Sequence, residues 1–204
     1  MARPRLAPDA RRAQIVKASM ALFARKGFSG TTSRALARAA GVSEALIFRL
    51  FPTKRALYTA IIQRTIASVE RPYDAPGGDR LPDRDVFLRL AGDLLARVRR
   101  NDAFLRLLMY AGLEGHALSD LYYEAHVARL IGHLRRRIAS GTRAGRYRAV
   151  DPVLAARAFM GMLVHYATAQ ALFARGRWPD LPVDRVARTF VDLFFSGLER
   201  GGRP

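Results

Sequence analysis

The chain has 204 residues, and 50% of them are hydrophobic, so it can bury a core of its own and is not a disordered protein. It contains no cysteine, which excludes disulfides, thiolate metal sites and cysteine nucleophiles. Thirty-five lysine and arginine residues against 17 acidic residues give a net charge of +18, which predicts a polyanionic partner because cations placed on phosphates release condensed counterions.

The positive charge is concentrated near the N-terminus. The first 60 residues hold 12 cations and two anions, which leaves +10 there and +8 in the rest of the chain. An arginine-rich composition set by genome base usage is the alternative explanation, and the asymmetry favours nucleic acid over it. Residues 1–12 are basic and contain no apolar run, so they are not a secretory signal.

Apolar residues recur at helical spacing through the first 70 residues. Gly27 and Gly41 are suited to end helices, Pro52 breaks the chain, and Ser43 and Thr53 are suited to cap the helices that follow them. Helices are therefore expected over residues 10–26, 33–40, 44–50 and 53–71.

The clearest loop is the segment over residues 72–82, which is rich in proline and glycine. Beyond it, helices are expected over residues 83–100, 102–114, 119–143, 152–174 and 183–199, with Asp151 as the N-cap before Pro152. Because no segment alternates with period two, the predicted class is all-α, with about nine helices in total. The longest uncharged stretch, residues 158–174, is shorter than the ~20 residues that a membrane span needs, so we expect a soluble cytoplasmic protein.

Residues 33–52 (SRALARAAGVSEALIFRLFP) predict a helix-turn-helix. Ala37 is small enough to let two helices cross closely, and Gly41 can take the positive φ that redirects the chain. The positions that such a motif buries are all apolar, namely Leu36, Ala40, Val42, Ile47 and Leu50. The face left for the major groove consists of Glu44, Ala45, Leu46, Phe48 and Arg49.

Residues 11–62 resemble the DNA-binding domain of the TetR/AcrR family of repressors. The matching blocks are residues 22–28, 30–33, 36–43 and 46–57. The resemblance implies an N-terminal three-helix helix-turn-helix domain and a larger C-terminal helical domain for ligand binding and dimerisation. The expected boundaries are residues 1–52 for the DNA-binding domain, 53–71 for a connecting helix and 72–204 for the C-terminal domain.

The resemblance also implies which residues contact operator DNA. Thr32 and Ser33 would contact phosphate, and Arg34 would reach a base edge such as guanine. Lys54 would clamp a phosphate from a helix N-terminus, and Ser43 would cap the second helix within the same surface. Capping is needed with or without DNA, so serving its own helix is the alternative role of Thr32.

On the second helix, Glu44, Ala45 and Leu46 would face bases. Glu44 would accept from cytosine N4, and Leu46 would touch a thymine methyl group. Alternatively, Glu44 stabilises its own helix, because an acidic residue in the first turn interacts favourably with the helix dipole.

Two positions depart from the family pattern. The family usually has tyrosine where Phe48 stands, so a hydroxyl contact to the DNA backbone is lost or replaced, and a core role is the alternative for Phe48. It commonly has histidine where Leu50 stands, so Arg49 would carry more of the phosphate contacts.

The last two helices are apolar over much of their circumference. A palindromic operator read by paired half-sites requires a dimer, and the resemblance assigns dimerisation to these helices. The expected interface residues are Val186, Phe190, Leu193, Phe194 and Leu198. A fully covered monomeric core is the alternative.

A pocket for an unknown small apolar or amphipathic ligand is also implied by the resemblance. Its candidate lining residues are Phe87, Phe104, Leu108, Met109, Tyr122, Tyr123, His126, Phe159, Met162, Leu163, His165 and Tyr166. Ordinary core packing is the alternative for each of them. Helix 53–71 is the expected lever between ligand and operator, because Lys54 would hold DNA while Ile62, Ile66 and Val69 would face the sensor domain.

Catalysis is not expected from this sequence. His126 and His133 share a helix but have no acidic residue at metal-ligand spacing between them, and no nucleophile elbow or phosphate loop occurs, so we predict no metal, cofactor or enzymatic activity. The predicted function is a sequence-specific transcriptional repressor released from a palindromic operator by a ligand. The alternatives are a sequence-independent, nucleoid-type binder and a peripheral membrane protein that uses residues 129–143.

Overall fold

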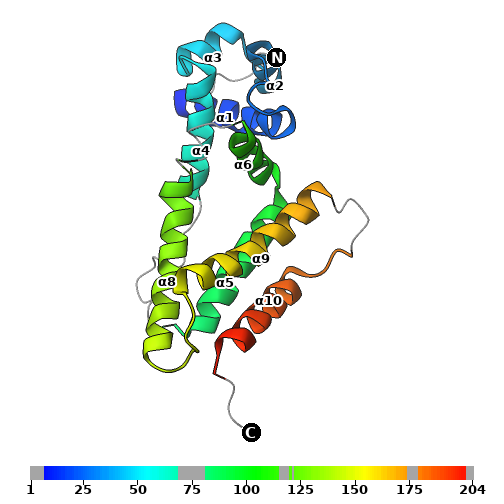
Figure 1. Ribbon diagram of the computed structural model, residues 1–204. Coiled ribbons are helices and arrows are strands. Elements are labelled where there is room, and N and C mark those ends of the chain that lie inside the picture. The colour runs from blue at the N-terminus through cyan, green and yellow to red at the C-terminus, as the bar shows by residue number, and fades with distance from the viewer. Residues whose placement is uncertain (1–6, 69–80, 115–119, 121, 174–178, 201–204) are drawn as a thin grey trace. The chain divides into compact units, whose positions relative to one another are not determined.

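The computed structural model describes residues 7–68, 81–114, 120, 122–173 and 179–200 (Figure 1). Within these ranges it holds nine α-helices, one π-helical turn and no strand beyond an isolated bridge, so the all-α prediction is confirmed. None of the helices in the described part is long and apolar enough to cross a membrane. Contacts between residues divide the chain into two compact units. The N-terminal unit consists of Met1–Val69 and Ala103–Tyr122, and the second unit consists of Glu70–Asp102 and Tyr123–Pro204.

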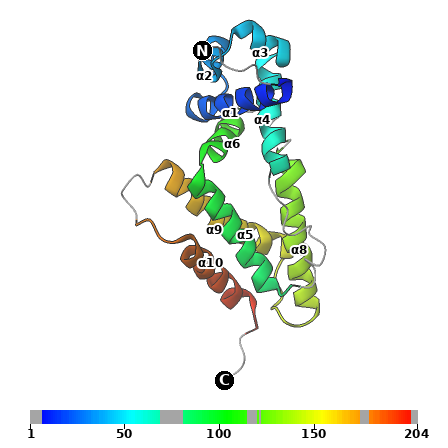
Figure 2. The same cartoon turned by 180° about the vertical axis from the view of Figure 1, so that it is seen from behind.

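The N-terminal unit contains five of the helices. Their bounds are α1 Pro8–Lys26, α2 Ser33–Ala40, α3 Glu44–Leu50, α4 Lys54–Ser68 and α6 Ala103–Leu113. α1 packs against α2, α4 and α6, and it lies between α2 and α6 in both Figure 1 and Figure 2. All five helices contribute buried apolar side chains to one core, among them Phe23, Leu36, Ile47, Ile61 and Leu107.

The place of α6 differs from the expected domain boundary, which put every residue after 71 in the C-terminal domain. Leu107 and Ala111 are fully buried in the same core as α1 and α4, and the Tyr58 hydroxyl donates a hydrogen bond to the Leu107 carbonyl at 3.2 Å. Ile62, expected to face the sensor domain, is fully buried in this core as well. Val69 and the side chain of Ile66 lie outside the described residues.

The helix starts in the N-terminal unit follow local capping. Thr32 and Ser43 each accept a hydrogen bond from the backbone N–H three residues further along, both at 3.2 Å. Thr53 does the same for α4 at 3.0 Å. The predicted caps by Ser43 and Thr53 are therefore confirmed, and each satisfies one of the N–H groups that a helix start leaves without a partner.

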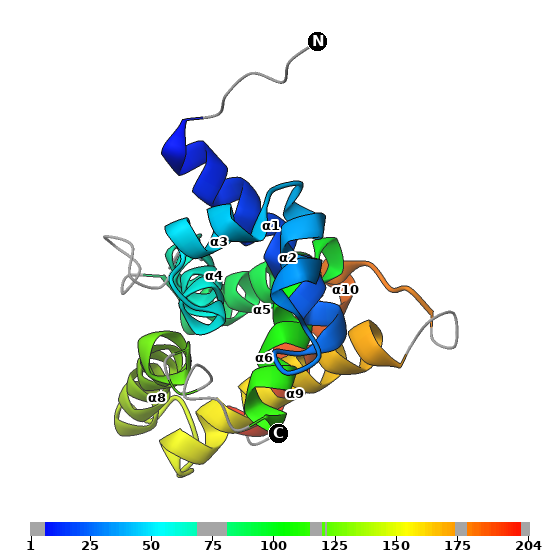
Figure 3. The same cartoon turned by 90° about the horizontal axis from the view of Figure 1, so that it is seen from above.

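The second unit consists of longer helices. Their bounds are α5 Asp83–Arg100, the π-helical turn η2 Tyr123–Val127, α8 Ala128–Arg143, α9 Pro152–Leu172 and α10 Val183–Leu198. α5 packs against α9 and α10, and α8 packs against α9 (Figure 3). The centre of the core is a phenylalanine cluster, in which the Phe87 ring lies 4.7 Å from Phe159, 5.4 Å from Phe194 and 5.2 Å from Phe195 between ring centroids.

The helix expected over residues 119–143 is interrupted. η2 takes π-helical geometry, contains the buried His126, and is followed by regular α-helix from Ala128. The predicted N-cap of the next helix is confirmed, because the Asp151 carboxylate accepts from the backbone N–H groups of Val153 and Leu154. Of the predicted loop over residues 72–82, residues 72–80 lie outside the described part.

A buried ion pair joins the start of α5 to α8. Arg137 contacts the Asp83 carboxylate at 2.8 Å, with side-chain exposures of 9% and 12%, and also donates to the Leu81 carbonyl and to His133 Nε2. The Tyr147 hydroxyl donates to the other Asp83 oxygen at 2.6 Å. Burial, followed by this hydrogen bond, raises the pKa of Tyr147 well above its ordinary value. The network closes the end of the second unit where the turn after α8 meets α5.

Candidate nucleic-acid interface and ligand cavity

The turn between α2 and α3 has the geometry that the sequence predicts for a helix-turn-helix. Gly41 takes φ +65° and ψ 37°, and its N–H closes α2 by donating to the Arg38 carbonyl. Nothing lies within 4 Å of the position that a Cβ would occupy there, so the left-handed backbone conformation, and not lack of space, calls for glycine. Leu36, Ala40 and Ile47 are buried as expected, and Val42 and Leu50 are half-buried.

This packing leaves one side of the motif free for a partner. Exposed side chains are those of Thr32, Arg34, Ser43, Glu44, Ala45, Phe48 and Arg49, while Ser33 and Leu46 are half-buried. Ile47 is the buried residue of α3, and this orients the helix so that Glu44, Ala45, Phe48 and Arg49 are exposed. Of the ten residues predicted to touch DNA, seven are therefore exposed on or beside α2 and α3, and two are half-buried there.

Thr32 and Ser43 hold α2 and α3 as caps and are exposed at the same time. In each cap the hydroxyl oxygen accepts from a backbone N–H, so the hydroxyl hydrogen remains a donor for an anion outside. A capping role and a phosphate contact are thus compatible at these two positions.

The tenth predicted residue, Lys54, is half-buried and bonded inside the unit. Its Nζ donates to the Phe28 carbonyl at 2.9 Å and to the Thr31 carbonyl at 3.0 Å, and it lies 4.3 Å from the centroid of the Phe28 ring. An ammonium group has three donors, so one is left for a phosphate. Lys54 is therefore an anchor of the chain before α2 in addition to being a candidate for DNA contact.

Glu114, which the sequence analysis did not single out, lies just after α6 and contacts the same stretch of chain. Its carboxylate accepts from Phe28 N at 3.1 Å and from Ser29 N at 3.2 Å. Burial and the Glu114 charge together raise the pKa of Tyr58, in the adjoining core, to about 12. The partners are separated by 86 and 85 residues, and no local pattern in the sequence signals such a contact.

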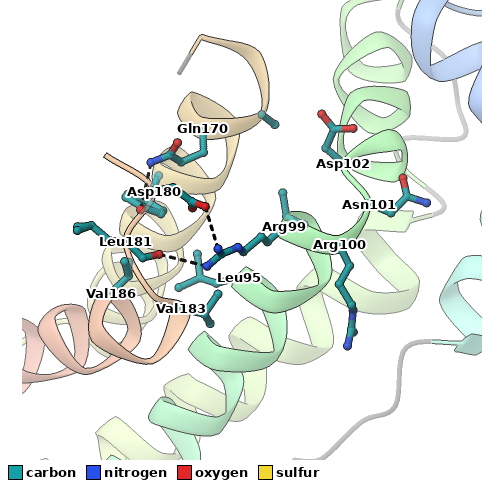
Figure 4. Close-up of a pocket in the computed structure, with 13 residues that line it drawn as sticks. Leu95, Arg99, Arg100, Asn101, Asp102, Gln170, Asp180, Leu181, Val183 and Val186 are labelled. Carbon is teal, nitrogen blue, oxygen red and sulfur yellow. Dashed lines mark hydrogen bonds and ion pairs between the residues drawn. The ribbon is translucent and has the colours of Figure 1, made fainter. Parts of the chain in front are cut away.

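The second unit contains a cavity of about 420 Å³ between the end of α5, α9 and the start of α10. Figure 4 shows Arg99 reaching from α5 to the opposite wall, where it contacts Asp180 at 2.8 Å and the Leu181 carbonyl at 3.4 Å. On α9, Gln170 Nε2 donates to the Tyr166 hydroxyl at 3.1 Å. Apolar walls come from Leu95, Val98, Ala171, Leu181, Val183 and Val186, and further polar groups from Arg100, Asn101 and Asp102. The lining exposes more polar than apolar surface, so a ligand bound here would need polar groups to meet it.

Of the twelve residues expected to line a pocket, Tyr166 lines this cavity and the others have different surroundings. Phe87, Phe159 and Leu163 fill the core of the second unit, since each is at most 1% exposed. The four candidates on α6 and just before η2 belong to the N-terminal unit, namely Phe104, Leu108, Met109 and Tyr122. His126 is buried in η2, Met162 is half-buried, and Tyr123 and His165 are exposed. Within the described ranges no three His, Asp or Glu side chains gather as metal ligands.

The five residues expected at a dimer interface also separate into two groups. Val186 and Leu198 are buried in the second unit's own core, Phe194 belongs to its phenylalanine cluster, and the Phe190 ring packs on Tyr166 at 5.6 Å. Leu193 is 61% exposed. Three further apolar side chains, which are not among the predicted interface residues, are exposed on α9, namely Val153, Leu154 and Val164.

Family models match both parts of the chain. Residues 15–61 match the model described as bacterial regulatory proteins, tetR family. Residues 88–197 match the model described as AefR-like transcriptional repressor, C-terminal domain. The two models together extend over the predicted helix-turn-helix and over most of the second unit.

Individual relatives are distant but cover most of the chain. The nucleoid occlusion factor SlmA of Actinobacillus pleuropneumoniae serotype 5b (strain L20) is 25% identical over 172 residues, which are 83% of each protein. A TetR transcriptional regulator from Agrobacterium tumefaciens is 26% identical, with a TM-score of 0.71 over 94% of this chain and 96% of that one. AibR, in a crystal structure with isovaleryl coenzyme A and operator DNA, is 17% identical, with a TM-score of 0.73 over 91% of this chain and 98% of that one.

Proposed function

The chain belongs to the TetR family of bacterial regulatory proteins and is a DNA-binding transcriptional regulator, and we propose that it is a repressor that binds a palindromic operator as a homodimer and leaves it when a small ligand binds. The observation that carries this proposal is the surface of α2 and α3, where a helix-turn-helix with correct caps and a left-handed Gly41 exposes its outer face. The match of the second unit to the C-terminal domain of a repressor supports repression over activation.

In the proposed complex α3 enters the major groove. Glu44, Ala45 and Leu46 lie in its first turn and face base edges, while Arg49 contacts the backbone. Arg34, exposed at the start of α2, reaches a base edge next to the groove, where its guanidinium can donate two parallel hydrogen bonds to guanine. The caps Thr32 and Ser43 use their hydroxyl hydrogens on phosphates.

The proposed ligand site is the cavity between α5, α9 and α10. Its volume and its mixture of apolar walls with Arg99, Gln170 and Tyr166 fit a small amphipathic molecule. AibR, whose fold this chain shares, has been crystallised with isovaleryl coenzyme A and operator DNA, which is an example of ligand and operator recognition on this fold.

The proposed dimer uses α9 and α10. Leu193 on α10 and Leu154 on α9 are 61% and 66% exposed in one chain, which favours their burial against a second copy. Two half-sites of a palindrome then meet two copies of α3.

A second candidate function is binding to the nucleoid without response to a single operator. It is favoured by the +18 net charge and by the similarity to a nucleoid occlusion factor. The two functions differ in specificity, because a regulator of one operator prefers its site to random DNA by roughly 10³-fold or more.

Selection of bound sequences from a random DNA library at near-physiological salt tests the proposal. We expect a palindromic consensus, and we expect Arg34→Ala to relax the preference at one position of each half-site by a factor corresponding to about 1–3 kcal/mol. Recovery of random sequences, bound with an affinity that depends only on salt, would favour the nucleoid candidate instead.

A further inference from the structure

The short connection between α1 and α2, residues 27–31, is held by one charged side chain from α4 and one from the residue just after α6. We call it the α1–α2 turn. On one side the Glu114 carboxylate accepts from Phe28 N and Ser29 N. On the other side Lys54 Nζ donates to the carbonyls of Phe28 and Thr31. The carboxylate thus accepts from N–H groups of the turn, and the ammonium group donates to its carbonyls. Hydrogen bonds to ionised groups are about twice as strong as those between neutral groups.

The rest of the turn is shaped to fit this arrangement. Gly27 has φ +70°, and a Cβ there would lie 2.7 Å from Glu114 Oε1 and 3.0 Å from the Tyr110 ring, so glycine leaves the space that the α6 side chains occupy. The buried Thr31 hydroxyl donates to the Gly27 carbonyl at 2.7 Å and closes the turn on itself. The turn is therefore held from within by the Thr31 hydroxyl and from outside by Glu114 and Lys54.

The position of α2 depends on this turn. Thr31 ends the turn, and the next residue, Thr32, is the N-cap of α2. α2 has only eight residues, so a displacement of its cap displaces the whole helix together with Arg34. α6 in turn is fixed on the unit by the hydrogen bonds from Tyr58 to Leu107 and from Tyr110 to Arg25.

We propose that Glu114 is a positioning residue for operator binding. Glu114 binds the N–H groups of the turn, Lys54 binds its carbonyls, and together they hold α2 in its DNA-binding position. This inference rests on the proposed function and deepens it, because it makes α6, which follows α5 in the chain, a working part of the DNA-binding unit. Glu114 itself touches no DNA in this account.

The test compares two substitutions that remove the same charge. Glu114→Gln places an amide group against the two N–H groups of the turn, whereas Glu124→Gln changes an exposed carboxylate on η2. Charge alone predicts that both losses of an anion leave DNA affinity unchanged or slightly higher. Positioning predicts that Glu114→Gln weakens binding to the selected operator about tenfold, the effect of losing a charge-assisted hydrogen bond, while Glu124→Gln does not weaken it.

Two further measurements separate positioning from general unfolding. Binding to random DNA depends on charge, so Glu114→Gln should bind it as tightly as the wild type or slightly more tightly, whereas partial unfolding would weaken both kinds of binding equally. Hydrogen exchange of the Phe28 and Ser29 amides in the free protein should be slow in the wild type and faster in Glu114→Gln, with the rest of α1 and α4 unchanged. Glu114→Asp, which keeps the charge and shortens the reach, should behave like Glu114→Gln.

Wild-type affinity of Glu114→Gln for the operator, or equal losses on operator and random DNA, would overturn the positioning role and leave the proposed function standing. Absence of any preferred sequence for the wild type would instead overturn the proposed function, and the positioning role with it.

Discussion

In the N-terminal unit, caps between near neighbours set the starts of α2, α3 and α4, whereas the core of the second unit is held by side chains that are distant in sequence. Thr32, Ser43 and Thr53 each bond the N–H three residues further along. In the second unit Asp83 pairs with Arg137, 54 residues away, and the phenylalanine cluster joins α5, α9 and α10. The starts of two short adjacent helices and the turn between them can be specified by local rules, while the position of α2 in its unit, the core and the cavity depend on contacts between distant segments.

The largest expected effect tests the long-range side of this comparison. Asp83→Ala removes the carboxylate that pairs with the largely buried Arg137 and accepts from the Tyr147 hydroxyl, so we expect the free energy of unfolding to fall by about 3–5 kcal/mol. Asp192→Ala is the control, because it removes an ion pair with Arg84 whose side chains are 47% and 71% exposed, and it should cost less than ~1 kcal/mol. Urea denaturation measures the free energy of unfolding of both variants, and equal losses would show that the network around Asp83 contributes no more than the exposed ion pair.

The second effect concerns the long-range contact inside the N-terminal unit. The pKa of Tyr58 is about 12 in the folded protein against 10.0 for the free side chain, so its stabilising contribution is complete below pH 10 and is lost as the pH rises toward 12. The free energy of unfolding of the wild type should therefore fall between about pH 9 and pH 12. In Tyr58→Phe this fall should be smaller by about 2 kcal/mol. Denaturation curves across this range provide the measurement, and parallel curves for the two proteins would show that Tyr58 does not carry the effect.

The same comparison explains what could be predicted from the sequence. The all-α class, the caps at Ser43, Thr53 and Asp151, and the turn at Gly41 depend on neighbours a few residues away, so a reading of spacing finds them. The exposed face of α3 follows from the same spacing, because burial of Ile47 fixes the orientation of the helix.

Contacts that depend on packing were outside the reach of that reading. Glu114 meets Phe28 across 86 residues, and nothing near either residue signals the contact. The apolar character of α10 predicts an interface role for Phe194 but does not predict its contacts with Phe87 and Phe159 inside its own unit. Arg99 and Asp180 meet across the cavity only because α5 and α10 pack side by side.

The third prediction tests the local side of the comparison with two glycines. Gly41→Ala forces a residue with a Cβ into the left-handed region, so it should destabilise the protein by about 1–2 kcal/mol although the site has room for a methyl group. Gly92→Ala, within α5 and with equal room, should stabilise by up to about 1 kcal/mol, since alanine favours helix. In thermal or urea unfolding, the free energy of unfolding should fall for Gly41→Ala and rise for Gly92→Ala. Changes of the same sign in both variants would contradict the comparison.

The smallest effect concerns the one departure from the family pattern that is exposed on α3. Phe48 is 40% exposed, and Phe48→Tyr adds a hydroxyl where the family usually has one, so operator affinity should rise about twofold to fivefold, the range expected for one hydrogen bond. The free energy of unfolding should stay the same, because the added hydroxyl can point to water. Unchanged affinity in a fluorescence-anisotropy titration would place Phe48 away from the DNA backbone.

The central claim is that the exposed face of α2 and α3 reads one DNA sequence. The most direct measurement is the ratio of dissociation constants for a selected palindrome and for a scrambled duplex of the same length, at near-physiological salt, with the wild type and with Arg34→Ala. We predict a ratio of roughly 10³ or more for the wild type and a clearly smaller ratio for Arg34→Ala. A ratio near one for both proteins, with affinities that change only with salt, would contradict the account and leave the basic charge as the whole basis of DNA binding.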